Sequence, residues 1–238
     1  MHKLYFHRGG DLEGELAFDS GTLRRVTTLQ PTVIDISGHH APERARVEAF
    51  IADVYRRSYG AEIKVSYPTL MSVRNGDGHI LAAVGYRCAG EEHLFLEQYT
   101  KRPIEEIVGG LYGRAVSRGQ IGEIGNLASE GGGASVFLFA AIASYLLRQG
   151  INYATVTGTK QLHNRFSTMG LNPHVVCSAS REALAQQQGD WGSYYDSDPR
   201  VLAGSLEESM QKLNEKLGAV YSENGKRLLP RLHYRCPQ

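Results

Sequence analysis

The stretch QIGEIGNLASEGGGASVFLFAAIASYLLRQG, residues 120–150, joins three segments of different character. The first alternates in hydropathy and predicts a strand. The side chains expected on one face of this strand are those of Ile121, Glu123, Gly125 and Leu127. An acidic residue and three glycines follow, and then a nearly all-apolar run from Ala134 to Leu147 predicts a buried helix. A strand that bears a carboxylate is thus followed directly by a glycine loop and an apolar helix. The rest of the sequence indicates which kind of protein has this order.

Composition sets loose bounds on the class of protein. The chain has 238 residues and a formal net charge of +1, so charge gives no case for a nucleic-acid partner. Three widely spaced cysteines without a CxxC pair fit reduced thiols, and no metal site is predicted because His39-His40 lacks a third ligand at useful spacing. The N-terminal residues show no signal-peptide core, and the apolar run is shorter than the roughly 20 residues that span a bilayer. We therefore expect a cytoplasmic protein without a membrane span.

Hydrophobic periodicity predicts the elements on either side of this stretch. Residues 1–30 are expected to form short strands, residues 42–60 an amphipathic helix that ends at Gly60, and residues 69–89 a hairpin that turns at residues 75–78. Later elements are expected as follows: a strand at 93–100, a short helix at 103–113, a strand at 152–159, a helix at 160–170, a strand at 174–179 and a helix at 206–217.

This order predicts an α/β (α+β) protein with a mostly antiparallel mixed sheet, flanking helices and a strand–loop–helix–strand core. One right-handed parallel crossover is expected within the sheet. Residues 1–30 are interpreted as an N-terminal strand extension, 31–205 as the core domain, and 206–238 as a C-terminal helix with a basic tail, all in one structural unit.

The order of elements resembles the GCN5-related N-acetyltransferase (GNAT) fold, and within it the autoinducer synthases that make acyl-homoserine lactones. That branch carries Glu-x-x-Arg on a strand; here Glu123-Ile124-Gly125-Asn126 occupies the position, and VTGT follows on a later strand. The segments LFLEQY, EIGNLAS, GTKQL and WGSYYDSDPRVLAG further resemble the thermostable hemolysin family, over roughly residues 30–205. This resemblance implies an N-acyltransferase that moves an acyl chain from a thioester to a small amine or amino acid.

Three residues are the catalytic candidates. A partly buried carboxylate has a raised pKa and can take a proton from an amine, directly or through water, so Glu123 is the candidate general base. Asn126 replaces the arginine of the autoinducer synthases; it can polarise a carbonyl, but lactone formation from S-adenosylmethionine is not expected. Arg87 is expected to anchor a substrate carboxylate or phosphate, with an ordinary salt bridge as the open alternative.

The glycine loop is the expected site for the donor phosphate, because loop N–H groups and the positive end of a helix attract anions. The residues assigned to it are Leu127, Ser129, Gly131, Gly132, Gly133 and Ala134. Ser129 stands where acetyltransferases have a basic or amide residue, and Glu130 would repel a pyrophosphate. The donor is therefore expected to be phosphopantetheine-linked, on an acyl carrier protein in preference to coenzyme A (CoA), as a substrate and not as a tightly bound cofactor.

The remaining site predictions concern the acyl chain and the acceptor. Glu97 and Tyr99 are placed on a strand beside the acceptor, and Thr157 and Thr159 on the strand next to the base. A tunnel along helix 134–147 is expected to hold the acyl chain, with Phe137 or Phe139 in its wall. Trp191 and Tyr194 are a further candidate floor for the tunnel, and Cys88 is expected to be a buried strand residue.

The basic tail is a candidate docking patch for the acidic surface of an acyl carrier protein, through Lys226, Arg227, Arg231 and Arg235; a plain solvated terminus is the open alternative. Two other functions remain open at this stage. One is a membrane-active lytic protein, and the other is a non-catalytic acyl-binding protein of the same fold.

Overall fold

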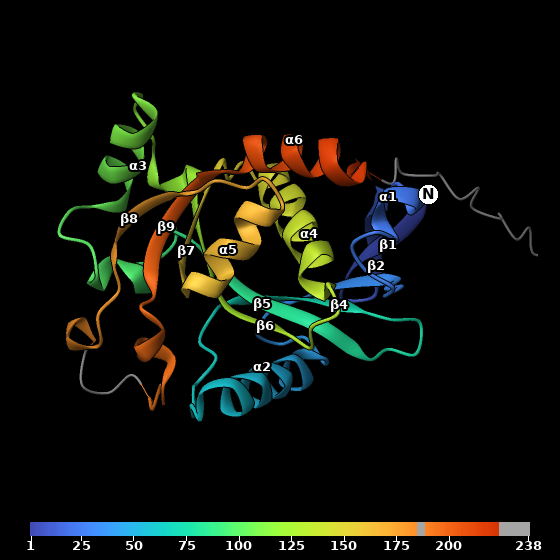
Figure 1. The fold of residues 1–238 in the computed structure, drawn as a ribbon, viewed down its shortest axis with the longest axis horizontal. Helices are drawn as coiled ribbons and strands as arrows, with labels where there is room; N and C mark the ends of the chain where they lie inside the picture. The colour runs from blue at the N-terminus through green and yellow to red at the C-terminus, as the bar shows by residue number, and fades with distance from the viewer. Residues whose placement is uncertain (185–188, 224–238) are drawn as a thin grey trace, which may run out of the picture.

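The fold centres on one twisted sheet, seen in a computed structural model that describes residues 1–184 and 189–223 (Figure 1). The ten strands in these residues are ordered β10-β2-β1-β3-β4-β5-β6-β7-β9-β8. Their bounds are β1 His2–Arg8, β2 Asp11–Phe18, β3 Val33–Ser37, β4 Thr69–Arg74, β5 Ile80–Cys88, β6 Ile121–Ser129, β7 Tyr153–Gly158, β8 His174–Ser178, β9 Arg200–Ser205 and β10 Val220–Glu223. The predicted mixed, mostly antiparallel sheet is confirmed.

Helices lie on both faces of this sheet. The α-helices are α1 Ser20–Leu23, α2 Arg44–Tyr59, α3 Ile104–Tyr112, α4 Ala134–Arg148, α5 Lys160–Thr168 and α6 Leu206–Leu217, and four short 3₁₀ segments are η1 Phe95–Gln98, η2 Arg118–Gln120, η3 Arg181–Ala183 and η4 Tyr194–Ser197. Helix α2 covers one face at β5 and β6, and α4 with α5 and α6 covers the other (Figure 1). These are called here the α2 face and the α4 face.

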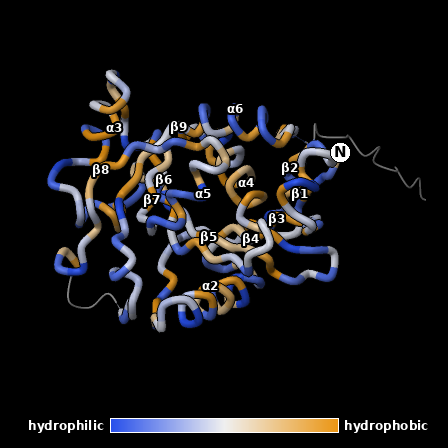
Figure 2. Tube along the Cα trace, in the orientation of Figure 1, coloured by the Kyte–Doolittle hydropathy of each residue, from blue (hydrophilic) through white to orange (hydrophobic). Residues whose placement is uncertain are grey.

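Helix α4 is the central element of the core. Every residue from Ala134 to Leu146 is buried, which is why its sequence is apolar all round and not on one stripe (Figure 2). The sheet packs on one side of it, α6 on another, and Phe18 of β2 contacts Phe137 edge-to-face at 5.4 Å. The N-terminal strands therefore complete the core around α4.

The strands of residues 1–30 extend the same sheet and do not form a separate layer. β1 pairs in parallel with β3, and β10 pairs with β2. The sheet thus has two parallel pairs, β1–β3 and β6–β7, where the sequence predicted one.

Two parts of the sequence interpretation were wrong. Residues 93–100, expected as a strand, contain the 3₁₀ segment η1, because the buried Glu123 carboxylate binds the N–H groups of Phe95 and Leu96 and the Glu97 carboxylate binds that of Leu94. The segment Arg200–Ser205, where the sequence predicted no strand, is β9, which lies between β7 and β8. The C-terminal stops were predicted correctly: Gly60 has φ 64° after α2, and α6 spans Leu206–Leu217.

An irregularity in β6 positions the site. β6 pairs with β7 only from Ile121 to Ile124, and its pairing with β5 shifts register between Ala83 and Gly85. At this bulge Asn126 has φ 51°, a left-handed conformation that asparagine tolerates. The bulge reverses the alternation of side chains, so Leu127 lies on the α4 face and not with Glu123 as the sequence predicted.

A glycine pair next to the bulge receives an aromatic ring. Gly85 and Gly125 are register partners on β5 and β6, and the Tyr67 ring lies across both of them. A Cβ added at Gly85 would stand 2.5 Å from Tyr67 Cγ, and one at Gly125 would overlap the Tyr67 hydroxyl. Only glycine at both positions lets this ring lie flat on the sheet.

We predict that Gly125→Ala lowers the free energy of unfolding by about 1–3 kcal/mol, because the buried ring must move away from the new methyl group. Gly38→Ala is the matched control, since Gly38 has open space at its Cβ position and an ordinary φ. Urea denaturation of the two variants measures the difference. Equal stability would show that Tyr67 does not occupy this position.

Candidate active site

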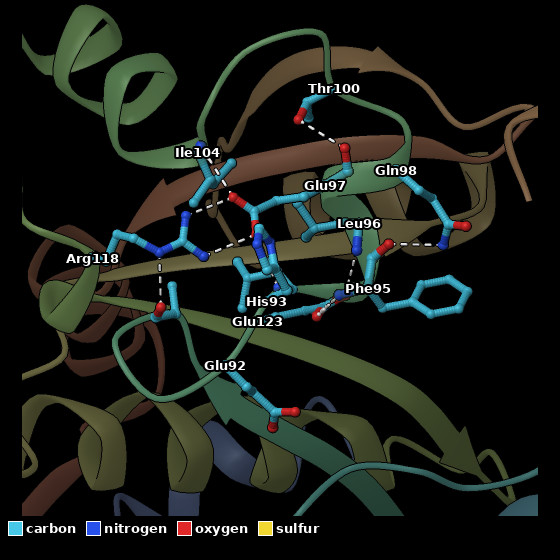
Figure 3. Close-up of polar contacts among 12 residues, drawn as sticks. Glu92, His93, Phe95, Leu96, Glu97, Gln98, Thr100, Ile104, Arg118 and Glu123 are labelled. Carbon is cyan, nitrogen blue, oxygen red and sulfur yellow. Dashed lines mark hydrogen bonds and ion pairs between the residues drawn. The ribbon is translucent and has the colours of Figure 1, made fainter. Parts of the chain in front are cut away.

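Glu123 lies on the α2 face with its carboxylate almost completely buried, at 1% exposure. Its oxygens accept hydrogen bonds from the backbone N–H groups of Phe95 (2.7 Å) and Leu96 (3.0 Å) at the start of η1 (Figure 3). Burial raises the pKa of the Glu123 carboxyl to about 7, against the lowering effects of Arg87, the two N–H groups and Tyr67. The carboxyl is thus poised to exchange a proton near neutral pH.

Arg87 is the charged partner of this carboxylate. Its Nε lies 3.5 Å from Glu123 Oε2, and its guanidinium stands 4.4 Å from the centre of the Tyr67 ring. The terminal nitrogens also reach Glu92 (3.3 Å) and Ser66 (3.5 Å). Arg87 is only 8% exposed, so its guanidinium is held inside the protein beside the Glu123 carboxylate. Its predicted role as a direct substrate anchor stays a prediction.

Glu97 forms a separate clamp, away from the separation of β6 and β7. Arg118 binds both of its oxygens, at 2.6 and 2.9 Å, and the Leu94 N–H donates to it at 2.9 Å (Figure 3). Arg118 also binds Glu105, and together these contacts lower the pKa of Glu97 to about 2. Glu97 therefore fixes the η1 loop, and both of its carboxylate oxygens are already bound by Arg118.

Asn126 stands where β6 and β7 separate. Its side chain is hydrogen-bonded to the hydroxyl of Tyr55 on α2. The backbone N–H and C=O groups at the bulge lie beyond the last β6–β7 register pair, Ile124–Val156. The two strands splay apart beyond this pair, and Asn126 lies at the base of the splay.

The threonines of the VTGT motif have different environments. The Thr157 hydroxyl is buried and has no hydrogen-bond partner within the described chain, and by strand alternation it lies on the face of Thr155 and Glu123. Thr159 instead caps α5, where its Oγ1 accepts from the Leu162 N–H. Thr157 is thus open to a ligand, whereas Thr159 has a structural role.

Aromatic side chains cover the α2 face around this point. Tyr99, in the turn after η1, shares a 2.6 Å hydrogen bond with Tyr195 of η4, and Tyr194 donates to the Thr157 carbonyl at 3.2 Å. Trp191 packs with Phe95 at 5.8 Å between ring centres. Tyr194 and Trp191 belong to this face, so they do not floor a channel along α4.

A mainly apolar cavity of about 260 Å³ opens on the α4 face. Ile124 and Leu127 of β6 and Val156 of β7 line it where these strands separate, and α4 contributes Phe139 and Ile142. Its other end is bordered by polar residues of α6 and the α5–β8 loop, among them Asn172, Gln211 and Lys212. The expected apolar space beside α4 is therefore present.

Of the two phenylalanines predicted for the cavity wall, the structure places only one there. Phe139 lines the cavity and packs against Phe166 of α5 at 5.0 Å. Phe137 points to the N-terminal strands, where it contacts Phe18 and His2.

The glycine loop before α4 is tightly built. Gly131, Gly132 and Gly133 all have positive φ, and the Ser129 hydroxyl accepts from the Gly131 N–H. Thr27 donates to the Gly132 carbonyl at 2.5 Å, so the N-terminal segment supports the loop. A Cβ at Gly133 would stand 2.8 Å from Thr27 Cβ, which excludes larger residues.

Two charged residues near the glycine loop affect whether an anion could bind there. Glu130, expected to repel a phosphate, pairs with His79 of the β4–β5 hairpin at 2.9 Å. Arg165 of α5 reaches the Ser135 hydroxyl in the first turn of α4 at 3.5 Å. Sequence reasoning missed Arg165 because it lies 30 residues from Ser135 along the chain.

Comparison with known proteins places the chain in a family. A family model described as thermostable hemolysin matches residues 37–210, more than half of the sequence. The chain belongs to the thermostable hemolysin family. A search of curated proteins found no match in sequence.

Solved structures show which fold this family member has. The acyl-homoserine lactone (AHL) synthase LasI superposes with a TM-score of 0.51 at 13% identity, over 77% of this chain and 94% of LasI. FeeM, an N-acyl amino acid synthase from uncultured soil microbes, gives 0.50 at 14% identity, over 74% and 98%. A GCN5-related N-acetyltransferase from Kribbella flavida gives 0.41 at 10% identity, over 72% and 97%. The predicted fold is confirmed, because LasI and FeeM share it over most of the chain.

Two further predictions concern a membrane span and the basic tail. No helix within residues 1–184 and 189–223 is long and apolar enough to cross a bilayer. The basic-tail residues Lys226, Arg227, Arg231 and Arg235 lie outside these ranges.

We predict that the Glu97–Arg118 clamp makes stability depend on pH in the acid range. Because the folded pKa of Glu97 is about 2 against an ordinary 4.5, the clamp stabilises the fold above pH 4.5 and this contribution is lost as the pH falls toward 2. The full effect is about 3 kcal/mol, at 1.36 kcal/mol per pKa unit. Glu97→Gln should remove this part of the pH dependence in urea denaturation, whereas Glu106→Gln, which removes an exposed pair with Arg102, should not. Parallel pH curves for wild type and Glu97→Gln would contradict the assignment.

Proposed function

We propose that the protein is an N-acyltransferase that moves an acyl chain, fatty acyl in preference, from a phosphopantetheine thioester to a small amine or amino acid. The observation that carries this proposal is the closeness of two features in the sheet. The apolar cavity opens on the α4 face where β6 and β7 separate, and the buried Glu123 carboxyl lies on the α2 face, one residue before the last β6–β7 pair.

The cavity supports an apolar acyl group. Its wall at Ile124, Leu127 and Val156 adjoins the unpaired backbone of the strand separation. Unpaired N–H and C=O groups there would bind the amide groups of a pantetheine arm, because such groups need partners. A thioester carbonyl would then stand between the strands, with the chain directed toward Phe139.

The α2 face supports an acceptor and a base. Glu123 has a pKa of about 7, and both the Thr157 hydroxyl and the Asn126 amide lie on the path to it. A general base is most effective when its pKa is near the working pH. The acceptor amine would thus approach from the α2 face while the donor enters from the glycine loop.

The glycine loop supports a single phosphate better than a pyrophosphate. Ser129 is used within the loop and Thr27 packs beneath it, so Arg165 is the cation at hand for an anion at the start of α4. An acyl carrier protein, which presents one phosphodiester, is therefore the proposed donor, with CoA as the other candidate.

The decisive test is an assay of the purified protein with acyl-pantetheine, acyl-CoA and acyl-carrier thioesters against a panel of amino acids and small amines, read by mass spectrometry. Formation of an N-acyl product supports the proposal, and the donor ranking separates carrier protein from CoA. Thioester binding without any product would favour a non-catalytic acyl-binding protein.

We predict that Glu123→Gln lowers kcat by about 10²–10⁴-fold, because an amide cannot accept the proton. Wild-type kcat/KM should rise with pH and level off above about 7, as the carboxyl ionises. Glu92→Gln is the matched control, since it removes a neighbouring carboxylate of Arg87 and leaves Glu123 in place.

Folding of Glu123→Gln must be checked by denaturation, since one of the two N–H groups of η1 will face an amide NH₂ group. A folded Glu123→Gln protein with near wild-type turnover would exclude Glu123 as the base.

We predict that Phe139→Leu shifts the preference toward longer acyl thioesters, because the smaller side chain lengthens the cavity. Each additional buried CH₂ contributes about 0.8 kcal/mol. Phe137→Leu is the matched control, because Phe137 contacts Phe18 and His2 outside the cavity. Competition between thioesters of different length measures the shift; the same shift in both variants would place the acyl chain elsewhere.

A further inference from the structure

The proposed base lies too far from the strand separation to reach a substrate there. Glu123 precedes Asn126 by three residues on β6, which is about 10 Å at the strand rise. Its carboxylate oxygens face the N–H groups of Phe95 and Leu96. A general base needs a contact of about 3 Å, or one intervening group, to take a proton. Some group must therefore connect Glu123 to the place of reaction.

Tyr67 occupies this gap. Its ring lies over Gly85 and Gly125, and its hydroxyl lies against Gly125, the residue between Glu123 and the bulge on the same face. The hydroxyl interacts with the Glu123 carboxylate, two residues before Gly125 on the same strand face, and lowers its pKa. The Arg87 guanidinium holds the other side of the ring at 4.4 Å. Tyr67 is thus held between the sheet and Arg87, with its hydroxyl at Gly125, between Glu123 and the bulge.

Neighbouring hydroxyls continue in the same direction. Tyr55 of α2 is hydrogen-bonded to Asn126 and interacts electrostatically with Tyr67. Tyr194 donates to the carbonyl of Thr157 on the other strand. The three hydroxyls therefore surround the strand separation on the α2 face, and Tyr67 is the one that interacts with Glu123.

We propose, on the basis of the acyltransferase function proposed above, that Tyr67 is a proton relay between the acceptor amine and Glu123. As the amine nitrogen forms the new C–N bond, it gives one proton to the Tyr67 oxygen, and the Tyr67 hydroxyl proton passes to Glu123. The C–S bond breaks, and Glu123 returns this proton through Tyr67 to the departing thiolate. The relay leaves both side chains as they began.

The charged and titratable groups that face Glu123 are few. Arg87 of β5 approaches it at 3.5 Å, Tyr67 precedes β4, and Tyr99 follows η1. Burial, with a smaller contribution from the negative charge of Glu123, raises the pKa of both tyrosines, so each hydroxyl keeps its proton when Glu123 is ionised. Tyr67 can therefore donate to Glu123 in the resting protein.

The first test needs no activity. Tyr67→Phe removes a hydrogen-bond donor to the ionised carboxyl, so the pKa of Glu123 should rise; ¹³C NMR of the carboxyl, assigned with Glu123→Gln, follows its titration. Tyr86→Phe is the matched control, because Tyr86 is a buried tyrosine whose ring packs with Tyr145 on the α4 face. An unchanged Glu123 titration in Tyr67→Phe would overturn the relay whatever the activity of the protein.

The second test uses the nucleophile. With an ordinary primary amine, Tyr67→Phe should lower kcat by about 10²-fold with little change in thioester KM, whereas Tyr86→Phe should stay near wild type. With methoxyamine, which is neutral at pH 7 and needs less help from a base, the loss should be much smaller. An equal loss for both nucleophiles, or no loss, would reject the relay while wild-type turnover still upholds the acyltransferase. Absence of product from wild type with every donor would instead reject the acyltransferase and the relay together.

Discussion

The interruption of hydrogen bonding between β6 and β7 is the constraint on which the site depends. Pairing stops at Ile124–Val156, and the bulge at Asn126 turns β6 away from its neighbour. In a continuous sheet these backbone groups would be satisfied and the two faces would be sealed from each other. The separation instead lies between an apolar cavity on the α4 face and a polar, aromatic environment on the α2 face.

Residues around this interruption support it through packing and hydrogen bonds. The glycine loop and the start of α4 follow the bulge directly, and Thr27 secures the loop from the N-terminal segment. On the α2 face, Tyr67 covers the Gly85–Gly125 pair and Tyr55 bonds Asn126. The N-terminal strands, which are remote from the site, matter because they complete the packing around α4.

Glu97 and Glu123 have the same side chain but opposite pKa shifts, because their environments differ. Glu97 meets a bidentate arginine at a partly solvated position, so its pKa falls to about 2. Glu123 is buried, and its desolvation outweighs Arg87 and two backbone donors, so its pKa rises to about 7. Both bind N–H groups of the η1 loop, and the difference follows from exposure and from the geometry of the arginine.

The sequence by itself determined most of the order of elements, the helix ends at Gly60 and Leu217, the β4–β5 hairpin, the buried α4 and the place of Glu123 on a strand before it, because these depend on local periodicity and turn residues. The tertiary structure alone decided the positions of η1, β9, Leu127 and Phe137, and it alone brought Tyr67 and Arg165 to the site. A bulge reverses which face a side chain occupies, and a buried carboxylate can convert an apparent strand into a 3₁₀ turn. The hydropathy of these residues predicts neither effect, because each effect arises from partners that are distant in the chain.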